Sequence, residues 1–286
     1  MKCLQRIKEL SFSQVVLYAS LFCVGIFHEY LSCLLSVVLL IWLCLRWKQN
    51  RQLTVSVTLT AVAMAVPCRI CADIGADHGK LSAAMLCRGL CEHMLVSDIS
   101  DKALEKSRVL LGGLNLQDQV TFSVADGLDG AKLLTEPLDT CFILGMGGET
   151  MAHILEAGQA ALNGAKLILS PQTDIPLVRA TLVAMGYRIR REEIVPSGKR
   201  HYVLMRAEPA LPGERPYTAE ELILGPVLMK ERPAAWEAYL RREEQYTLTA
   251  IQAMEKATTD KDLQRLADFR ETLSLVQEAL RGFEKE

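Results

Sequence analysis

The stretch ADIGADHGKLS, Ala72–Ser82, decides the fold of this chain. The apolar run CRICADI, residues 68–74, leads into it, and the helical pattern LSAAMLCRGL, residues 81–90, follows it. We therefore expect a strand, a tight turn and a helix, an arrangement that binds nucleotide-like ligands at the helix N-terminus. The turn is unusual, because Asp77 and His78 stand where a dinucleotide-binding loop carries its middle glycine.

Apolar strand patterns alternate with helical patterns from this turn to about residue 208. The later strand candidates are HMLVSDI, VTFSVAD, DTCFILG, AKLILSP, YRIRREEIV and HYVLMRAE, with helical patterns at 102–111, 149–157 and 175–185. This alternation predicts an α/β fold with a mostly parallel, doubly wound sheet. Only PSGKR separates the last two strands, so we expect them to form a closing antiparallel hairpin. The pattern resembles the Rossmann-like sheet of S-adenosylmethionine-dependent methyltransferases.

Composition limits the class of protein. The chain has 286 residues, of which 50% are hydrophobic, so it can bury a large core. Its net charge of -2 places any nucleic-acid contact on local basic groups rather than on the whole surface. The 9 cysteines favour reduced thiols and a cytoplasmic catalytic domain. The pairs Cys68/Cys71 and Cys87/Cys91 have zinc-like spacing, but positions on a strand and its following helix favour core packing, so we expect no metal.

Residues 1–52 differ in composition from the rest. Basic residues flank a long apolar run from Val15 to Leu45, which the polar patch His28-Glu29-Tyr30 interrupts. Three interpretations fit an apolar N-terminal helix of this kind: a transmembrane anchor, a stretch upstream of the true start near Leu53, or a packed helical hairpin. Membrane contact is expected only through residues 1–50.

The last part of the chain reads as helical. The catalytic domain is expected at 53–210, and the Pro/Gly linker PALPGERPYT, residues 209–218, leads into a helical part at 217–286. Apolar residues recur there at helical spacing: Leu263, Leu266, Phe269, Leu273, Val276 and Leu280. This predicts a helical hairpin or short antiparallel coiled coil, with Thr259 or Asp260 capping the last helix.

Acidic residues in the first turn indicate the charge of the ligand. Asp73 ends the strand, Gly75 permits close backbone approach, and Gly79 opens the helix. A carboxylate suits the ammonium and sulfonium groups of S-adenosylmethionine and would repel a pyrophosphate. We therefore place Asp73, Gly75, Asp77 and Gly79 at this cofactor. The alternative for Asp77 is that it only caps the helix.

The next two strand ends continue the cofactor site. Asp98 ends the second strand, and we expect it to accept the ribose hydroxyls, with Ile99 beside it. Asp126 and Gly127 follow the third strand and are expected at the adenine ring. A helix cap at Asp98 and a plain turn at Asp126-Gly127 are the alternatives.

The sequence GMGGE follows the fourth strand. Gly145 and Met146 are expected at the cofactor, whereas Gly147 and Gly148 leave the backbone open to a flat substrate. The alternative is a flexible turn without a ligand.

Five motifs together resemble one family. In content and order they resemble the motifs of the bacterial tRNA (adenine(22)-N(1))-methyltransferase family, whose members are class I enzymes. The motifs are DIGADHG, GMGGETMAHILEAG, LILSP, LVRATLVAMGY and LGP. The resemblance covers about residue 53 to the C-terminus. It implies a Rossmann-like catalytic domain, a C-terminal coiled-coil domain, and methylation of N1 of an adenine in the D-loop region of tRNA with S-adenosylmethionine as donor.

The implied chemistry assigns roles to the turn. The N1 lone pair of adenine attacks the methyl group, and Asp77 is our candidate for stabilising the cationic product. His78 is expected to orient Asp77 or to contact the base, which must leave the folded tRNA; a purely structural histidine is the alternative. Lys80 and Arg200 are expected to bind the RNA, Arg200 with other basic residues that flank the final hairpin.

This sequence departs from the family pattern at three positions. Thr58 replaces an arginine, and Lys80 and Ser82 replace the usual residues after the DHG turn, all expected near the substrate mouth. Two other functions therefore stay open: methylation of another RNA base or a small molecule, and a non-catalytic, membrane-tethered binding protein.

Overall fold

The computed structural model describes residues 57–197, 200–254 and 259–284. Residues Val55–Glu286 form one compact unit. The expected apolar helix and membrane anchor at 1–52 lie outside the described residues. Among the helices that are described, none is both long and apolar enough to cross a membrane.

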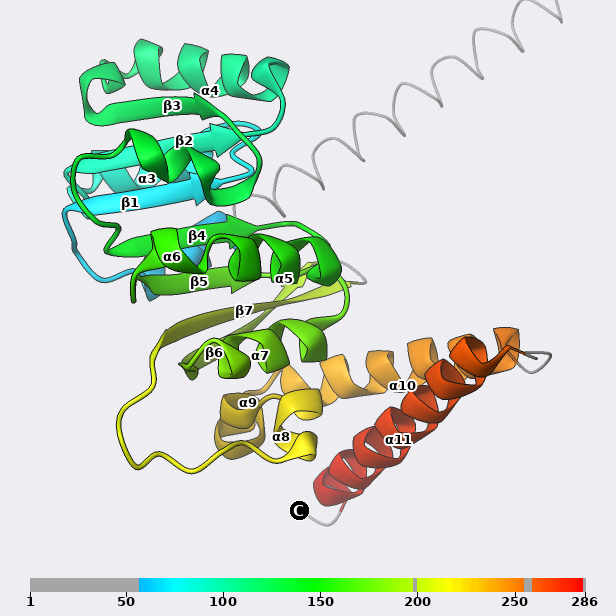
Figure 1. The fold of residues 1–286 in the computed structure, drawn as a ribbon. Coiled ribbons are helices and arrows are strands. Elements are labelled where there is room, and N and C mark those ends of the chain that lie inside the picture. Colours follow the sequence, from blue (N-terminus) through cyan, green and yellow to red (C-terminus); the bar gives the residue numbers. More distant parts are fainter. Residues whose placement is uncertain (1–56, 198–199, 255–258, 285–286) are drawn as a thin grey trace, which may run out of the picture. The chain divides into compact units, whose positions relative to one another are not determined.

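A seven-stranded sheet forms the centre of the unit (Figure 1). The strands are β1 (Ile70–Ile74), β2 (His93–Asp98), β3 (Val120–Val124), β4 (Thr140–Leu144), β5 (Lys166–Ser170), β6 (Tyr187–Ser197) and β7 (Arg200–Pro209). Their order is β3-β2-β1-β4-β5-β7-β6. The first five are parallel, and β7 runs antiparallel to β5 and β6. This confirms the mostly parallel sheet and its closing hairpin.

Helices cover both faces of the sheet (Figure 1). They are a helix at 57–64, α3 (Lys80–Cys87), α4 (Asp101–Gly113), α5 (Gly148–Ala157), α6 (Gln159–Leu162) and α7 (Ile175–Ala184), with short 3-10 helices η1 (Gln117–Gln119) and η2 (Gly127–Leu133). The C-terminal part contains α8 (Ala219–Leu224), α9 (Pro226–Glu231), α10 (Trp236–Ala253) and α11 (Asp260–Phe283).

The side chains of β1 alternate between two hydrophobic cores. Ile70, Ala72 and Ile74 belong to one cluster and Cys71 to the other, as the two-residue period of a strand requires. Because both faces are buried, the strand reads as a continuous apolar run. Cys91 was expected on the helix after β1, but α3 ends at Cys87 and Cys91 lies beyond it, buried in the second core.

The C-terminal helices pack into the first core. Leu224, Trp236 and Val276 belong to the same cluster as β1 and β4, so apolar burial is continuous from the sheet to α11. Helices α10 and α11 pack against each other (Figure 1), and Thr259 caps α11 by accepting the Asp262 N–H. The helical pair is confirmed, whereas its coiled-coil geometry stays a prediction.

A buried ion pair joins the sheet to these helices. Arg179 on α7 donates from Nε to Glu192 on β6 over 2.9 Å, and both side chains are fully buried. The Arg179 guanidinium also donates to the carbonyl groups of Leu222 and Ile223, at the end of α8. Glu192 accepts the N–H of Val227 at the start of α9 over 2.9 Å. One pair of charges therefore satisfies the backbone at the junction of α8 and α9.

Candidate functional site

The site lies at the edge where the parallel strands end. The loop after β1 is fixed to β2, because the N–H groups of Gly75 and Ala76 both donate to the Ser97 carbonyl, over 2.8 and 3.2 Å. The loop after β4 is fixed to β5 by a hydrogen bond from Gly145 N–H to the Ser170 carbonyl. The predicted site residues that follow β1, β2, β3 and β4 therefore share one edge.

Asp73 is a buried carboxylate with one side-chain partner. It is 6% exposed, and Ser82 donates its hydroxyl to Oδ2 over 2.7 Å. Burial raises the pKa of Asp73 to about 6, hydrogen bonds from Ser82 oppose the rise, and the nearby Asp98 adds to it. Ser82 was expected at the substrate mouth; it is fully buried and orients Asp73 instead.

Asp77 contacts two basic side chains. Its carboxylate lies 2.6 Å from Lys106 Nζ and 2.6 Å from His78 Nδ1. Burial acts to raise the pKa of Asp77, but the Lys106 hydrogen bond and the His78 charge prevail and lower it. The side chain is 55% exposed, so it remains accessible to a substrate. The N-cap of α3 is Gly79, without a side-chain cap, so the cap-only alternative for Asp77 is wrong.

Sequence reasoning missed Lys106. It lies on α4, 29 positions beyond Asp77, among other charged residues on the same helix. A lysine on the exposed side of a helix carries no signal that it reaches another loop. Helix α4 also supports that loop through Ser107, which donates its hydroxyl to the Ala76 carbonyl over 2.6 Å.

Gly79 is required by both conformation and space. Its φ is +60°, and a Cβ there would lie 3.0 Å from Cβ of Ser107. A larger residue would push α4 away from the turn that holds Asp77.

Asp98 is fixed at the end of β2 by its own loop. Asp98 Oδ1 accepts the Ser100 N–H over 2.8 Å, which fixes the carboxylate at the strand end. Ser100, rather than Asp98, caps α4 through Ala103 N–H. Ile99 is 72% exposed, and an apolar side chain held at the surface beside a carboxylate suits an adenine or ribose face.

The residues after β3 lie at the same edge. Asp126 is exposed, and it precedes η2 without making a side-chain cap hydrogen bond. Gly127 adopts a φ of +51°. The structure thus keeps the Asp126 carboxylate out of local helix capping, as the predicted adenine contact needs.

Met146 connects the two loops that the sequence assigned separately to the cofactor. Its terminal methyl group lies 2.1 Å from where a Cβ on Gly75 would be. Gly148 differs from the expectation. It is buried, its N–H donates to Thr173 Oγ1 over 3.2 Å, and a Cβ there would lie 2.4 Å from the Thr173 carbonyl oxygen. Its backbone is therefore used in packing, and Gly147, the half-buried N-cap of α5, is the more open of the two.

Two basic residues expected to bind RNA lie at this edge. Lys80 is the first residue of α3, directly after the DHG turn. Arg200 begins β7 and is exposed; because β7 runs antiparallel to β5, its start lies on the side where β5 ends. Thr58, the third departure from the family pattern, lies half-buried in the helix at 57–64.

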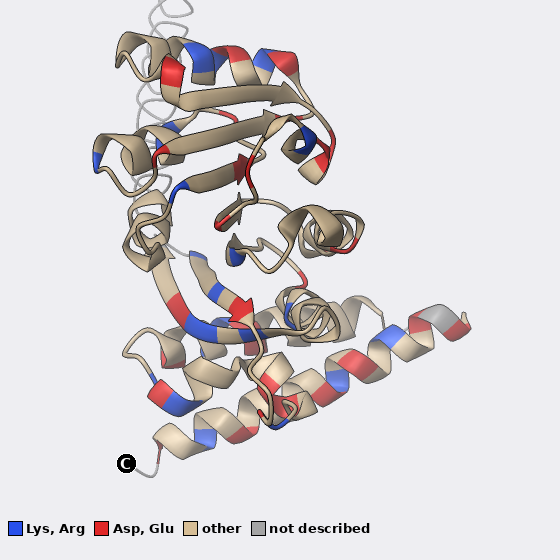
Figure 2. Ribbon diagram, turned by 60° about the vertical axis from the view of Figure 1, so that its left-hand side comes forward, with Lys and Arg blue, Asp and Glu red and all other residues tan. Residues whose placement is uncertain are grey.

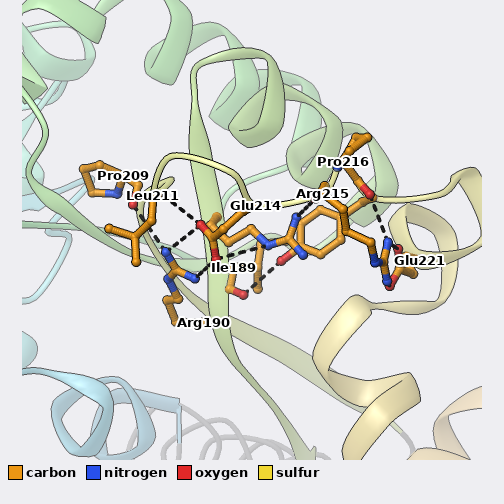
Figure 3. Close-up of polar contacts among 10 residues, drawn as sticks. Ile189, Arg190, Pro209, Leu211, Glu214, Arg215, Pro216 and Glu221 are labelled. Atoms are coloured by element: carbon orange, nitrogen blue, oxygen red, sulfur yellow. Dashed lines mark hydrogen bonds and ion pairs between the residues drawn. The ribbon is translucent and has the colours of Figure 1, made fainter.

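Arginines at the other end of the hairpin hold the linker. Arg190 pairs with Glu214 and lowers the pKa of that carboxyl to about 2 (Figure 3). Arg188 lies 3.6 Å from the centre of the Tyr217 ring and donates to the Arg215 carbonyl. Arg188 and Arg190 belong to the basic residues flanking the final hairpin that were expected to bind RNA; they contact the segment between β7 and α8 instead.

Several carboxylates gather at this edge. Figure 2 shows acidic residues near strand ends and in the loops that follow them. Asp73 lies in β1, Asp77 in the loop after it, and Asp98 at the end of β2. Within 57–197, 200–254 and 259–284, no group of three or more His, Cys, Asp or Glu side chains could hold a metal ion. Such an edge suits a cationic organic ligand.

The strand order with its antiparallel β7, and an acidic site at the strand ends, define a class I S-adenosylmethionine-dependent methyltransferase. The sequence pattern of one family, tRNA (adenine(22)-N(1))-methyltransferase, matches residues 71–278. The chain belongs to this family.

Individual relatives agree with this assignment. The tRNA (adenine(22)-N(1))-methyltransferase of Bacillus subtilis is 27% identical over 238 residues, which cover 80% of this chain and 98% of that protein. The crystal structure of the B. subtilis M1A22 tRNA methyltransferase has a TM-score of 0.67 at 24% identity, covering 78% of this chain and 97% of that one. A Streptococcus pneumoniae structure, described as a putative tRNA (m1A22) methyltransferase in complex with S-adenosyl-L-methionine, has a TM-score of 0.65 at 21% identity, with 78% and 97% covered. The family favours an RNA methyltransferase over the small-molecule and non-catalytic alternatives.

Proposed function

We propose that this chain methylates N1 of adenine 22 in tRNA and that the loop after β1 performs the chemistry. The observation that carries the assignment is the set of carboxylates at the strand ends within the part of the chain that matches the family. A neutral nucleophile such as adenine N1 needs no strong base, so the protein must chiefly hold the reactants together and place negative charge where positive charge develops.

The residues of the first two strand ends suit the cofactor. S-adenosylmethionine, when bound, supplies a methyl group activated on a positively charged sulfur. The buried Asp73 carboxylate would accept the ammonium group, which offers it a positive partner that the ligand-free site lacks. Asp98 would accept the ribose hydroxyls with Ile99 against the ring, and Asp126 would accept the adenine amine.

Asp77 is proposed to act on the acceptor base. Lys106 and His78 hold its carboxylate and keep it ionised, while more than half of the side chain stays exposed. When N1 of adenine gains a methyl group, the base becomes cationic, and an ionised carboxylate nearby lowers the energy of that charge. His78 is then a positioning residue for Asp77, consistent with their 2.6 Å contact.

The tRNA would extend beyond the base pocket. We propose that Lys80 and Arg200 contact its phosphates and that residues 217–286, as a coiled coil of α10 and α11, form a second tRNA-binding surface. Figure 2 shows basic and acidic residues interspersed along these two helices, so binding there cannot depend on a uniform positive charge. With tRNA as substrate, we expect catalysis in the cytoplasm.

The direct test is methyl transfer by the full chain. Purified protein is incubated with methyl-labelled S-adenosylmethionine and an unmodified tRNA transcript, and the nucleosides are separated by mass. We expect 1-methyladenosine at position 22 and no product from a transcript that carries guanosine there. Methylation of another base, or transfer to the guanosine transcript, would contradict the proposal.

Replacing Asp77 by asparagine is expected to lower kcat by about 100-fold, because the amide keeps the shape but loses the charge that stabilises the product. S-adenosylmethionine affinity, measured by calorimetry, should change little.

A Lys106→Met variant tests the same carboxylate in a second way. It retains Asp77 but removes a group that lowers the pKa of Asp77, so the acidic limb of the kcat–pH profile should move to higher pH. Weakened cofactor binding with normal turnover at saturation would reject the role of Asp77 in the reaction.

A further inference from the structure

A cleft of about 630 Å³ lies between the start of α7 and the α10–α11 pair. One wall is the segment from Gln172 to Leu177, and the opposite wall consists of α10 and α11 side chains, including Tyr246 and Phe269. The floor is apolar, because the lining residues Leu240 and Val276 are buried in the first core. The cleft is large enough for a nucleotide.

The cleft adjoins the candidate site through one segment. Gln172 N–H donates to the Met146 carbonyl over 2.8 Å, and Thr173 Oγ1 accepts the Gly148 N–H. Both Gln172 and Thr173 also line the cleft. The loop after β5 therefore forms a partition with the glycine loop on one side and the cleft on the other. The candidate site and the cleft therefore share one wall, made of Gln172 and Thr173.

Aromatic and guanidinium groups stand at the mouth of the cleft. Tyr246 is 59% exposed, so the ring is open to a ligand. Its ring meets that of Phe269 edge to face, with centroids 6.4 Å apart. The exposed Arg265 guanidinium lies 5.8 Å from the centre of the Phe269 ring. Phe269 is half-buried, which leaves Tyr246 as the exposed ring of the pair. Proteins stack unpaired nucleobases on exposed aromatic rings and on arginine side chains.

Carboxylates inside the cleft indicate which part of a nucleotide enters. Glu243 and Asp268 line it, and burial raises the pKa of Glu243 while Arg242 and Arg179 oppose the rise. Carboxylates would repel a phosphate but accept hydrogen bonds from the amino and ring N–H groups of a base. Arg242 also lines the cleft, beside Glu243. A base whose amino group donates to Glu243 would leave its phosphate toward the exposed Arg265.

We propose that this cleft binds an unstacked nucleotide of the tRNA close to the target adenosine, with its base against Tyr246 and its phosphate near Arg265. The proposal rests on the proposed function and adds to it a second base-binding site. It explains why the helical pair is fixed to the catalytic sheet: the distance between the two sites selects tRNAs that present two unpaired nucleotides at a set separation.

The first test is the affinity of the full chain for unmodified tRNA. Tyr246→Ala is expected to raise both the Kd and the KM for tRNA by about tenfold without lowering kcat. This is the effect of losing one stacked base. Tyr246→Phe should retain affinity, since the ring face is kept. Leu114→Ala is the control, because Leu114 is an exposed apolar residue at the end of α4, outside both the cleft and the helical part, and should leave Kd unchanged.

The second test identifies the nucleotide. Transcripts in which one nucleotide near adenosine 22 lacks its base are measured against wild type and Tyr246→Ala. At one position, the loss of affinity from removing the base and the loss from Tyr246→Ala should be non-additive. Once that base is absent, the Tyr246 ring has nothing to stack on. Additive losses at every position, or a Tyr246→Ala Kd within twofold of wild type, would overturn the proposal. Absence of 1-methyladenosine from the wild-type reaction would instead refute the proposed function, since these binding measurements need no methyl transfer.

Discussion

Replacing Asp73 by asparagine is expected to stabilise the ligand-free chain at neutral pH and to abolish S-adenosylmethionine binding. Asp73 is buried, and its side chain has Ser82 as a neutral hydrogen-bond partner. Ionising it there is unfavourable, which raises its pKa to about 6. Asparagine keeps an oxygen that Ser82 can donate to and carries no charge, so the cost of the buried charge disappears together with the partner for the cofactor's ammonium group.

The pH dependence of this effect has a definite sign. The folded-state pKa of Asp73 lies above the value of about 4 expected in the unfolded chain, so its protonation favours folding below about pH 4, and that stabilisation is lost as pH rises through about 6. The difference in unfolding free energy between variant and wild type should therefore be near zero at pH 4 and reach about 3 kcal/mol above pH 7.

Urea unfolding across this pH range measures the difference, and calorimetry measures cofactor binding. Asp126→Asn is the control for stability, because an exposed carboxylate at the same edge should show no such pH-dependent gain. A folded Asp73→Asn variant that still binds S-adenosylmethionine with wild-type affinity would remove Asp73 from the cofactor site. If the variant is more stable and fails to bind, Asp73 lowers the stability of the chain in order to bind the cofactor.

The sequence allowed the sheet and the strand-end acids to be predicted because each depends on local pattern. Asp73 is the last but one residue of β1 and Asp98 the last of β2, so each lies near the carboxyl edge of the sheet whatever the details of packing. The closing hairpin followed from the five residues between two apolar runs. The family motifs then specified which ligand such an edge binds.

Contacts between distant segments could not be predicted in the same way. Lys106 reaches Asp77 from another helix, and Gly148 packs on Thr173 beyond the next strand. Ser82 was expected at the surface, but α3 turns it inward to Asp73. In each case the residue type suits an exposed position as well as a position in contact with another element. Only the packing of one element on another decides between the two.

Breaking the buried pair of Arg179 and Glu192 is expected to have the largest effect on stability. A Glu192→Gln or Arg179→Met variant leaves one charge buried without its partner, at a cost of about 3–5 kcal/mol in the free energy of unfolding. Each also removes hydrogen bonds to the backbone where α8 ends or α9 begins. No sequence pattern indicated that these two side chains are buried, since arginine and glutamate are mostly surface residues.

Urea unfolding of the two single variants and the double variant separates charge from packing. The double variant should lose less free energy of unfolding than the sum of the losses of the two single variants, because neither charge is then left unpaired. Glu237→Gln is the matched control: it breaks the exposed Glu237–Arg241 pair one turn apart on α10 and should cost under about 0.5 kcal/mol. Because the pair fixes α8 and α9, which lead into α10, a folded single variant should bind tRNA more weakly while keeping its affinity for S-adenosylmethionine. Equal losses for the buried and exposed pairs would show that Arg179 and Glu192 do not hold the helical part on the sheet.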